Sequence, residues 1–222
     1  MIKMNSNSSL SLSRLVLFGA PILMGIVSVI HPVPTGESFI ESIEPHLGIW
    51  LAVHVVQLAL IGLIGITIGL LGSGLSGTAA TISRVAVVFF LVFYGAFDGI
   101  VGLSTGVLVW LRQTFVSSDQ AVTGRLVEAF WDARLDPASL VPVVILIGSF
   151  SWLVAATSLG LALRRAGASR SILWLLILSG AFFGIDHPFP TGTLGMICLL
   201  GAVILIERKS PKPFEAARVA AS

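Results

Sequence analysis

Four histidines stand out in a strongly apolar chain, because an imidazole nitrogen can bind zinc, copper or iron. They are His31, His46, His54 and His187. Ionisable side chains in a membrane protein usually face a partner, a cavity or a cofactor, since hydrocarbon cannot satisfy their donors and acceptors. The sequence therefore predicts a site for a metal ion or a haem. The chain has no Cys-x-x-Cys-His signal, so a haem would be bound non-covalently.

Two of these histidines begin nearly identical hexapeptides. His31–Gly36 reads HPVPTG and His187–Gly192 reads HPFPTG, a match at five of six positions. Each follows an apolar run, so the prolines are expected to end a helix and each threonine to cap the next one. Because the two preceding helices run in the same direction, we expect both corners on the same side of the membrane, with their histidines approaching across a pseudo-twofold axis.

A second group of polar residues is expected to accompany the histidines. His46, His54 and Gln57 lie at spacings of eight and three, on one broad face of a helix. Asp98 lies inside another apolar run, and a hydrogen bond from His54 or Gln57 would relieve the cost of burying it. That contact could equally be a structural clasp between two helices. Asp186, next to His187, could orient the imidazole ring.

The apolar residues that position these groups occur in long runs. Only 11% of the 222 residues are charged, and the mean hydropathy is +0.99, which indicates a polytopic membrane protein. The predicted fold is an all-α membrane helix bundle of about six transmembrane helices within residues 15–207. The expected spans are 15–31, 47–71, 85–111, 140–163, 172–187 and 191–206. The run at 172–187 is short for a full crossing.

The remaining segments are two tails and one long loop. Residues 1–14 form a polar tail, 208–222 a basic tail, and the loop 113–138 carries an amphipathic segment at 126–131 that could lie on the membrane surface or cap a site. In the six-span arrangement, ten of the thirteen lysines and arginines fall on the side of the two tails. The excess of positive charge predicts that both termini are cytoplasmic and that all four histidines lie in the exterior half.

Three functions fit these residues. The first is a membrane protein that binds a metal or haem through the histidines, and the second is a small proton-coupled transporter that uses Asp98 and His54. The third is a non-enzymatic assembly component, in which the polar residues serve only packing.

Motifs for nucleotide hydrolysis, zinc proteases, serine hydrolases and nucleic-acid binding are absent, and an enzymatic role is left open. The expected partners are the lipid bilayer of a plasma or inner membrane and a homo-oligomer or other membrane protein.

Overall fold

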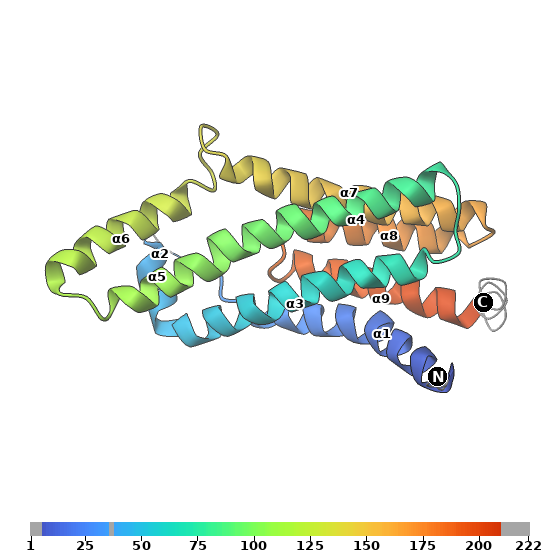
Figure 1. The fold of residues 1–222 in the computed structure, drawn as a ribbon, viewed down its shortest axis with the longest axis horizontal. Coiled ribbons are helices and arrows are strands. Elements are labelled where there is room, and N and C mark those ends of the chain that lie inside the picture. Colours follow the sequence, from blue (N-terminus) through green and yellow to red (C-terminus); the bar gives the residue numbers. More distant parts are fainter. Residues whose placement is uncertain (1–5, 36–37, 210–222) are drawn as a thin grey trace, which may run out of the picture.

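The chain folds into an elongated bundle of helices. The computed structural model describes residues 6–35 and 38–209 (Figure 1), and within these ranges there are helices and no strands. The predicted all-α fold is therefore confirmed. Arg14 near the start of α1 (Ser6–Ile30) pairs with Glu207 near the end of α9 (Thr191–Lys209) at 3.2 Å, which places these two helix ends at the same end of the bundle. The cytoplasmic location of the termini stays a prediction.

Within the described residues, five helical stretches are long and apolar enough to cross a membrane, as expected of a multi-pass membrane protein. They are Leu12–Ile30, Phe39–Leu71, Thr78–Arg112, Val141–Arg165 and Thr191–Arg208. The sixth apolar helix, α8 (Arg170–Ile185), has 16 residues, so it extends only about 24 Å at the rise of an α-helix. The sequence predicted about six spans with a short one at this position, and the structure has five long helices and this shorter one.

Some boundaries differ from those expected. Helix α1 begins at Ser6, so helix extends into the segment predicted as a polar tail. Helix α4 (Thr78–Phe97) begins seven residues before the predicted span at 85, because the small and polar residues at its start are compatible with a helix even though they are weakly apolar. The predicted basic tail 208–222 lies mostly outside the described residues, since α9 is described only to Lys209.

The long helices form a closed ring. In order around it, α3 (Leu47–Leu71) contacts α4, α4 contacts α7 (Val141–Arg165), and α7, α8, α9, α1 and α3 follow, each packed on the next. Small residues allow the backbones to approach closely. A Cβ at Gly148 of α7 would lie 2.9 Å from the backbone nitrogen of Tyr94 in α4. Trp152, Phe90 and Phe183 fill the centre between these helices.

One end of the ring is covered by two shorter helices from the loops. Helix α2 (Phe39–Ile43) follows the first corner, and α6 (Ser117–Asp132) contains the segment 126–131 that was predicted to be amphipathic. Phe39 stacks on Trp131 at 4.2 Å between ring centroids. The Glu128 carboxylate of α6 accepts hydrogen bonds from the Ser38 hydroxyl at 2.6 Å and from two backbone N–H groups at the start of α2, each at 3.0 Å. A side chain of α6 therefore caps α2.

Glu128 gives a test of this cover. Partial burial raises the pKa of Glu128, but the hydrogen bonds from Ser38, Ile40 and Phe39 outweigh it and hold the pKa below its ordinary value. An acid with a lowered folded-state pKa stabilises the fold above the pKa of the unfolded chain, and this contribution is lost as pH falls through the folded-state pKa. We therefore expect Glu128→Gln to cost about 1 kcal/mol at neutral pH and to lose less on acidification than the wild type.

The measurement is thermal unfolding in detergent at pH about 7 and about 4. The matched control is Asp119→Asn, which removes an exposed carboxylate from the same helix. Equal acid sensitivity of Glu128→Gln and the wild type would show that the cap contributes nothing.

Candidate metal site

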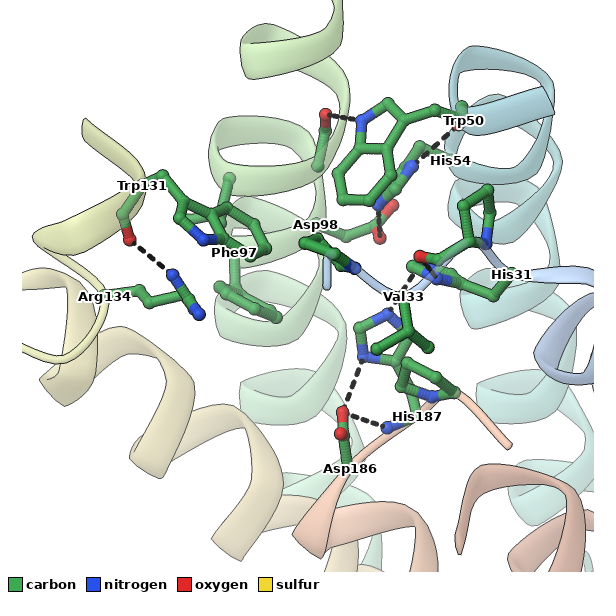
Figure 2. Close-up of a pocket in the computed structure, with 15 residues that line it drawn as sticks. His31, Val33, Trp50, His54, Phe97, Asp98, Trp131, Arg134, Asp186 and His187 are labelled. Carbon is green, nitrogen blue, oxygen red and sulfur yellow. Dashed lines mark hydrogen bonds and ion pairs between the residues drawn. The ribbon is translucent and has the colours of Figure 1, made fainter. Parts of the chain in front are cut away.

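Three histidines from three separate parts of the ring meet beneath this cover. His31 directly follows α1, His54 lies in α3, and His187 follows α8. One ligand nitrogen from each lies within 4.8 Å of the others, and the Nε2 atoms of His31 and His187 are 3.2 Å apart (Figure 2). The prediction that the two corners bring their histidines together is borne out by this contact. We refer to His31, His54 and His187 as the histidine cluster.

The hydrogen bonds of the cluster fix which nitrogens are free. His31 Nδ1 lies 2.8 Å from the Pro32 carbonyl oxygen, and His54 Nδ1 lies 2.8 Å from the Trp50 carbonyl oxygen. Because a carbonyl only accepts, both Nδ1 atoms carry the proton and both Nε2 atoms present a lone pair. His187 Nδ1 lies 3.8 Å from Asp186 Oδ1. In His31 and His54, one ring nitrogen is held by an acceptor and the other is free, an arrangement that is typical of metal-binding histidines.

Burial keeps the two corner histidines neutral. It lowers the pKa of His31, and it holds the pKa of His187 well below the ordinary value, with the neighbouring histidines adding to the effect. His187 Nδ1 is too far from Asp186 Oδ1 for a hydrogen bond, so the His187 tautomer that is protonated at Nε2 can donate to the His31 Nε2 lone pair at 3.2 Å. A bound cation would replace this hydrogen bond, with the His187 proton on Nδ1 and the Nε2 lone pairs of both rings directed at the metal.

The second corner is held in place by its own backbone. The His187 N–H donates to Asp186 Oδ1 at 2.9 Å, and the Phe189 N–H donates to the Ser28 carbonyl of α1 at 2.9 Å. The Thr191 hydroxyl donates to the Asp186 carbonyl at 2.8 Å. A Cβ at Gly192 would overlap the His187 carbonyl, which explains the glycine that ends this hexapeptide. The corner is therefore tied both to itself and to α1.

The predicted threonine caps are wrong. Thr191 is the first residue of α9, and its hydroxyl closes the corner by donating to carbonyls. After the first corner, Ser38 is the residue that caps α2, with its hydroxyl accepting from the Glu41 N–H at 3.2 Å. The prolines were expected to end the preceding helices, and α1 and α8 do end at Ile30 and Ile185, just before the two corners. Gly36 of the first hexapeptide lies outside the described residues.

The third histidine is held between α3 and the helix opposite. That helix runs from α4 through a π-helical turn, η2 (Asp98–Ser104), into α5 (Thr105–Arg112). Trp50 donates its indole N–H to the Gly102 carbonyl at 2.7 Å, and its ring lies 4.3 Å from the His54 ring. A Cβ at Gly102 would overlap the His54 imidazole. Only glycine at this position leaves room for the third ring of the cluster.

Asp98, the first residue of the π-helical turn, is a buried acid beside the cluster. Its Oδ1 lies 4.0 Å from His54 Nε2, and its side chain is 1% exposed. The expected hydrogen bond from His54 or Gln57 is not formed: neither carboxylate oxygen of Asp98, nor the Gln57 amide nitrogen, has a hydrogen-bond partner among the described residues. The distance to His54 is too long for a hydrogen bond. Asp98 therefore faces the cluster without a hydrogen bond from any of its histidines.

The cluster forms one wall of a cavity of about 190 Å³. Asp98 and Gly102 line it from the π-helical turn, and Trp131 and Arg134 line it from α6 and the residues after it (Figure 2). The Arg134 guanidinium lies 3.6 Å from the centroid of the Trp131 ring. Asp186, which was expected to orient His187, also lines the cavity. Burial raises the pKa of Asp186, against the opposing effects of the His187 N–H and the Arg134 charge.

His46 does not join the cluster. Its side chain is exposed in η1 (Glu44–His46), the short turn before α3, and eight residues of helix separate it from His54, or about 12 Å. Conversely, sequence reasoning missed Trp50 and Arg134, and it named Trp131 only as part of the segment 126–131 that could cap a site. Trp50 could have been found from its position four residues before His54, on the same helix face. Nothing local in the sequence links Trp131 or Arg134 to the histidines.

Gly102 provides a test of how closely the cluster is packed. We expect Gly102→Ala to destabilise the protein by about 1–3 kcal/mol, because the new methyl group overpacks the site against His54. The measurement is thermal unfolding in detergent. Gly99→Ala is the matched control in the same turn, since a Cβ there meets nothing within 4 Å. If Gly102→Ala were no less stable than Gly99→Ala, the close approach of His54 to this helix would be contradicted.

The arrangement can hold a cation with three imidazole nitrogens and has a buried carboxylate beside them. It lies at a cavity, so a further ligand has room to approach. Its walls are mainly apolar and aromatic, as is common for small-molecule sites. Comparison of the chain with protein-family models, with curated proteins and with solved structures finds no match.

Proposed function

We propose that this multi-pass membrane protein binds a transition-metal ion through His31, His54 and His187. The observation that carries the proposal is the 3.2 Å separation of the His31 and His187 Nε2 atoms, with the His54 ligand nitrogen in the same small group. Zinc bound by imidazole nitrogens at about 2.0–2.1 Å in a tetrahedral site would hold two of them about 3.3 Å apart. The spacing of the corner histidines supports a metal of this size between them.

The ligand type supports a transition metal over an alkaline-earth ion. Three imidazoles suit zinc, copper, iron and nickel, whereas calcium and magnesium prefer oxygen ligands. The hydrogen bonds from Nδ1 of His31 and His54 to carbonyls support the same conclusion, because they fix the ring orientation before the metal arrives. Pre-orientation lowers the cost of ordering the ligands when the metal binds.

A haem is disfavoured by the spacing of the rings. The His31 and His187 rings have centroids 4.8 Å apart, and their Nε2 atoms point toward each other at 3.2 Å. A bis-histidine haem needs its two ligand nitrogens on opposite faces of a planar macrocycle. The His54 ring, 4.9 Å from the His31 ring, occupies the same space. A single ion fits between these nitrogens, and a macrocycle does not.

The proposed location follows from the charge pattern of the sequence. The excess of lysine and arginine on the side of the two tails supports an exterior location for the cluster, in a plasma or inner membrane. The metal would then be acquired from outside the cell through the cavity bordered by Trp131 and Arg134. The surrounding lipid bilayer is the one partner that the five apolar helices require.

The test is the metal content of the purified protein. We expect about one bound zinc or other transition-metal ion per chain after purification in detergent and removal of loosely bound metal. His31→Gln, His54→Gln and His187→Gln should each weaken binding by at least about tenfold, because each removes one ligand nitrogen. The measurement is elemental analysis by mass spectrometry, followed by a zinc titration against a competing chelator.

His46→Gln is the matched control, because His46 is exposed and lies outside the cluster. It should keep the metal content and affinity of the wild type. A wild-type protein that binds no transition metal, or cluster variants that bind it as well as His46→Gln does, would reject the proposed function and leave the cluster with a packing role.

A further inference from the structure

The carboxylate of Asp98 is buried and receives no hydrogen bond from the three histidines. It lies within a membrane-spanning stretch and has no hydrogen bond from any described residue. An unpaired charge or an unsatisfied carboxyl in such an environment is strongly destabilising. In the part of the chain that the structure describes, its one ion-pair contact is with His54 at 4.0 Å. The side chain that would benefit most from a nearby cation therefore lies directly beside the proposed metal site.

We propose that Asp98 supplies the fourth, anionic ligand of the metal, an inference that rests on the proposed function. This ligand would make the site selective for a divalent ion over monovalent copper. Three neutral imidazoles alone would accept either ion. A carboxylate attracts a doubly charged ion twice as strongly as a singly charged one at the same distance. Its hard oxygen also suits zinc or iron(II) better than copper(I), which prefers soft sulfur ligands.

The geometry places Asp98 within reach of this role. Ligand atoms of one tetrahedral zinc site lie about 3.3 Å apart, and Asp98 Oδ1 is 4.0 Å from His54 Nε2. A shift of the carboxylate toward His54 by about 0.7 Å, the difference between these distances, would bring it to ligand spacing from the His54 nitrogen. No hydrogen bond from a described residue has to be broken for this movement. The carboxylate also lines the cavity that His31, His54 and His187 share.

The π-helical turn explains why Asp98 points at the cluster. Such turns insert an extra residue into a helix and occur frequently at functional sites. Here the turn places Asp98 and Gly102 on the same wall of the cavity. The carboxylate therefore lies next to the space that Gly102, which has no side chain, leaves for the His54 ring. The Ser104 hydroxyl donates to the Gly99 carbonyl at 2.8 Å, and the Thr105 hydroxyl donates to the Gly102 carbonyl at 3.0 Å. These bonds stabilise the irregular turn within the membrane-spanning stretch.

The experiment compares two metals on the purified full-length chain. Zinc(II) and copper(I), the latter under reducing conditions, are titrated against competing chelators into the wild type, Asp98→Asn and the control Asp119→Asn. We expect Asp98→Asn to weaken zinc binding by about 10–100-fold and to change copper(I) affinity by less than about threefold, since the three imidazoles remain. Asp119→Asn removes an exposed acid outside the cavity and should change neither.

The outcomes separate this inference from the proposed function. A wild type that binds neither metal rejects both. A wild type that binds zinc, with the same affinity in Asp98→Asn, leaves the histidine site standing and rejects Asp98 as a ligand. A parallel loss of zinc and copper(I) in Asp98→Asn also rejects the inference, because it indicates a structural role for the carboxylate.

A second measurement does not depend on whether Asp98→Asn folds. The wild type loaded with cobalt(II) should show the intense visible absorption bands of a four-coordinate site with three nitrogens and one oxygen. Asp98→Glu, which keeps the charge and moves it along by one methylene, should bind cobalt(II) and shift these bands. Weak bands of a six-coordinate ion in the wild type, or a spectrum that Asp98→Glu leaves unchanged, would overturn the inference.

Discussion

The structure around the histidine cluster is governed by the inability of a membrane interior to satisfy polar groups. In water, a lone pair or a carboxylate that finds no protein partner binds solvent, but within hydrocarbon each needs a partner from the chain or from a ligand. His31 and His54 meet half of this need with carbonyls of their own segments. One ligand nitrogen from each of the three histidines lies in the same small group, beside a carboxylate without a hydrogen bond from any described residue. The fold thus gathers three imidazoles and one acid in a single place.

The close approach of the three histidines depends on contacts between helices all around the ring. The bond from Phe189 to Ser28 joins the second corner to α1, the helix that His31 directly follows. The π-helical turn and Gly102 bring the opposite helix close enough for His54 to fit. Above the cluster, Glu128 fixes α2 to α6, and Trp131 completes the cover by stacking on Phe39. Each of these contacts joins segments that are distant in sequence, so the site depends on the whole bundle being formed.

The sequence predicted the features that depend on local physics. Long apolar runs identified the membrane helices, and the repeated His-Pro corners indicated that His31 and His187 would meet. It grouped His46 with His54 on one helix face, although the helical rise already puts about 12 Å between them, because the depth of the cavity depends on how the corners and the π-helical turn pack. The positions of Trp131 and Arg134 depend on how α6 folds back over the bundle. The π-helical turn was also missed, since it arises from packing between helices that no local propensity encodes.

Closure of the ring has a consequence for how the protein is made. Chains emerge from the ribosome with their N-terminal part first, so His31 and His54 enter the membrane well before His187. The last corner is fixed only when α8 and α9 have packed against their neighbours, because its bonds run to Ser28 of α1 and to Thr191 of α9. A nascent chain therefore lacks the complete cluster until its final helices are inserted. The proposed metal ion could therefore bind all three histidines only after the last two helices are in place.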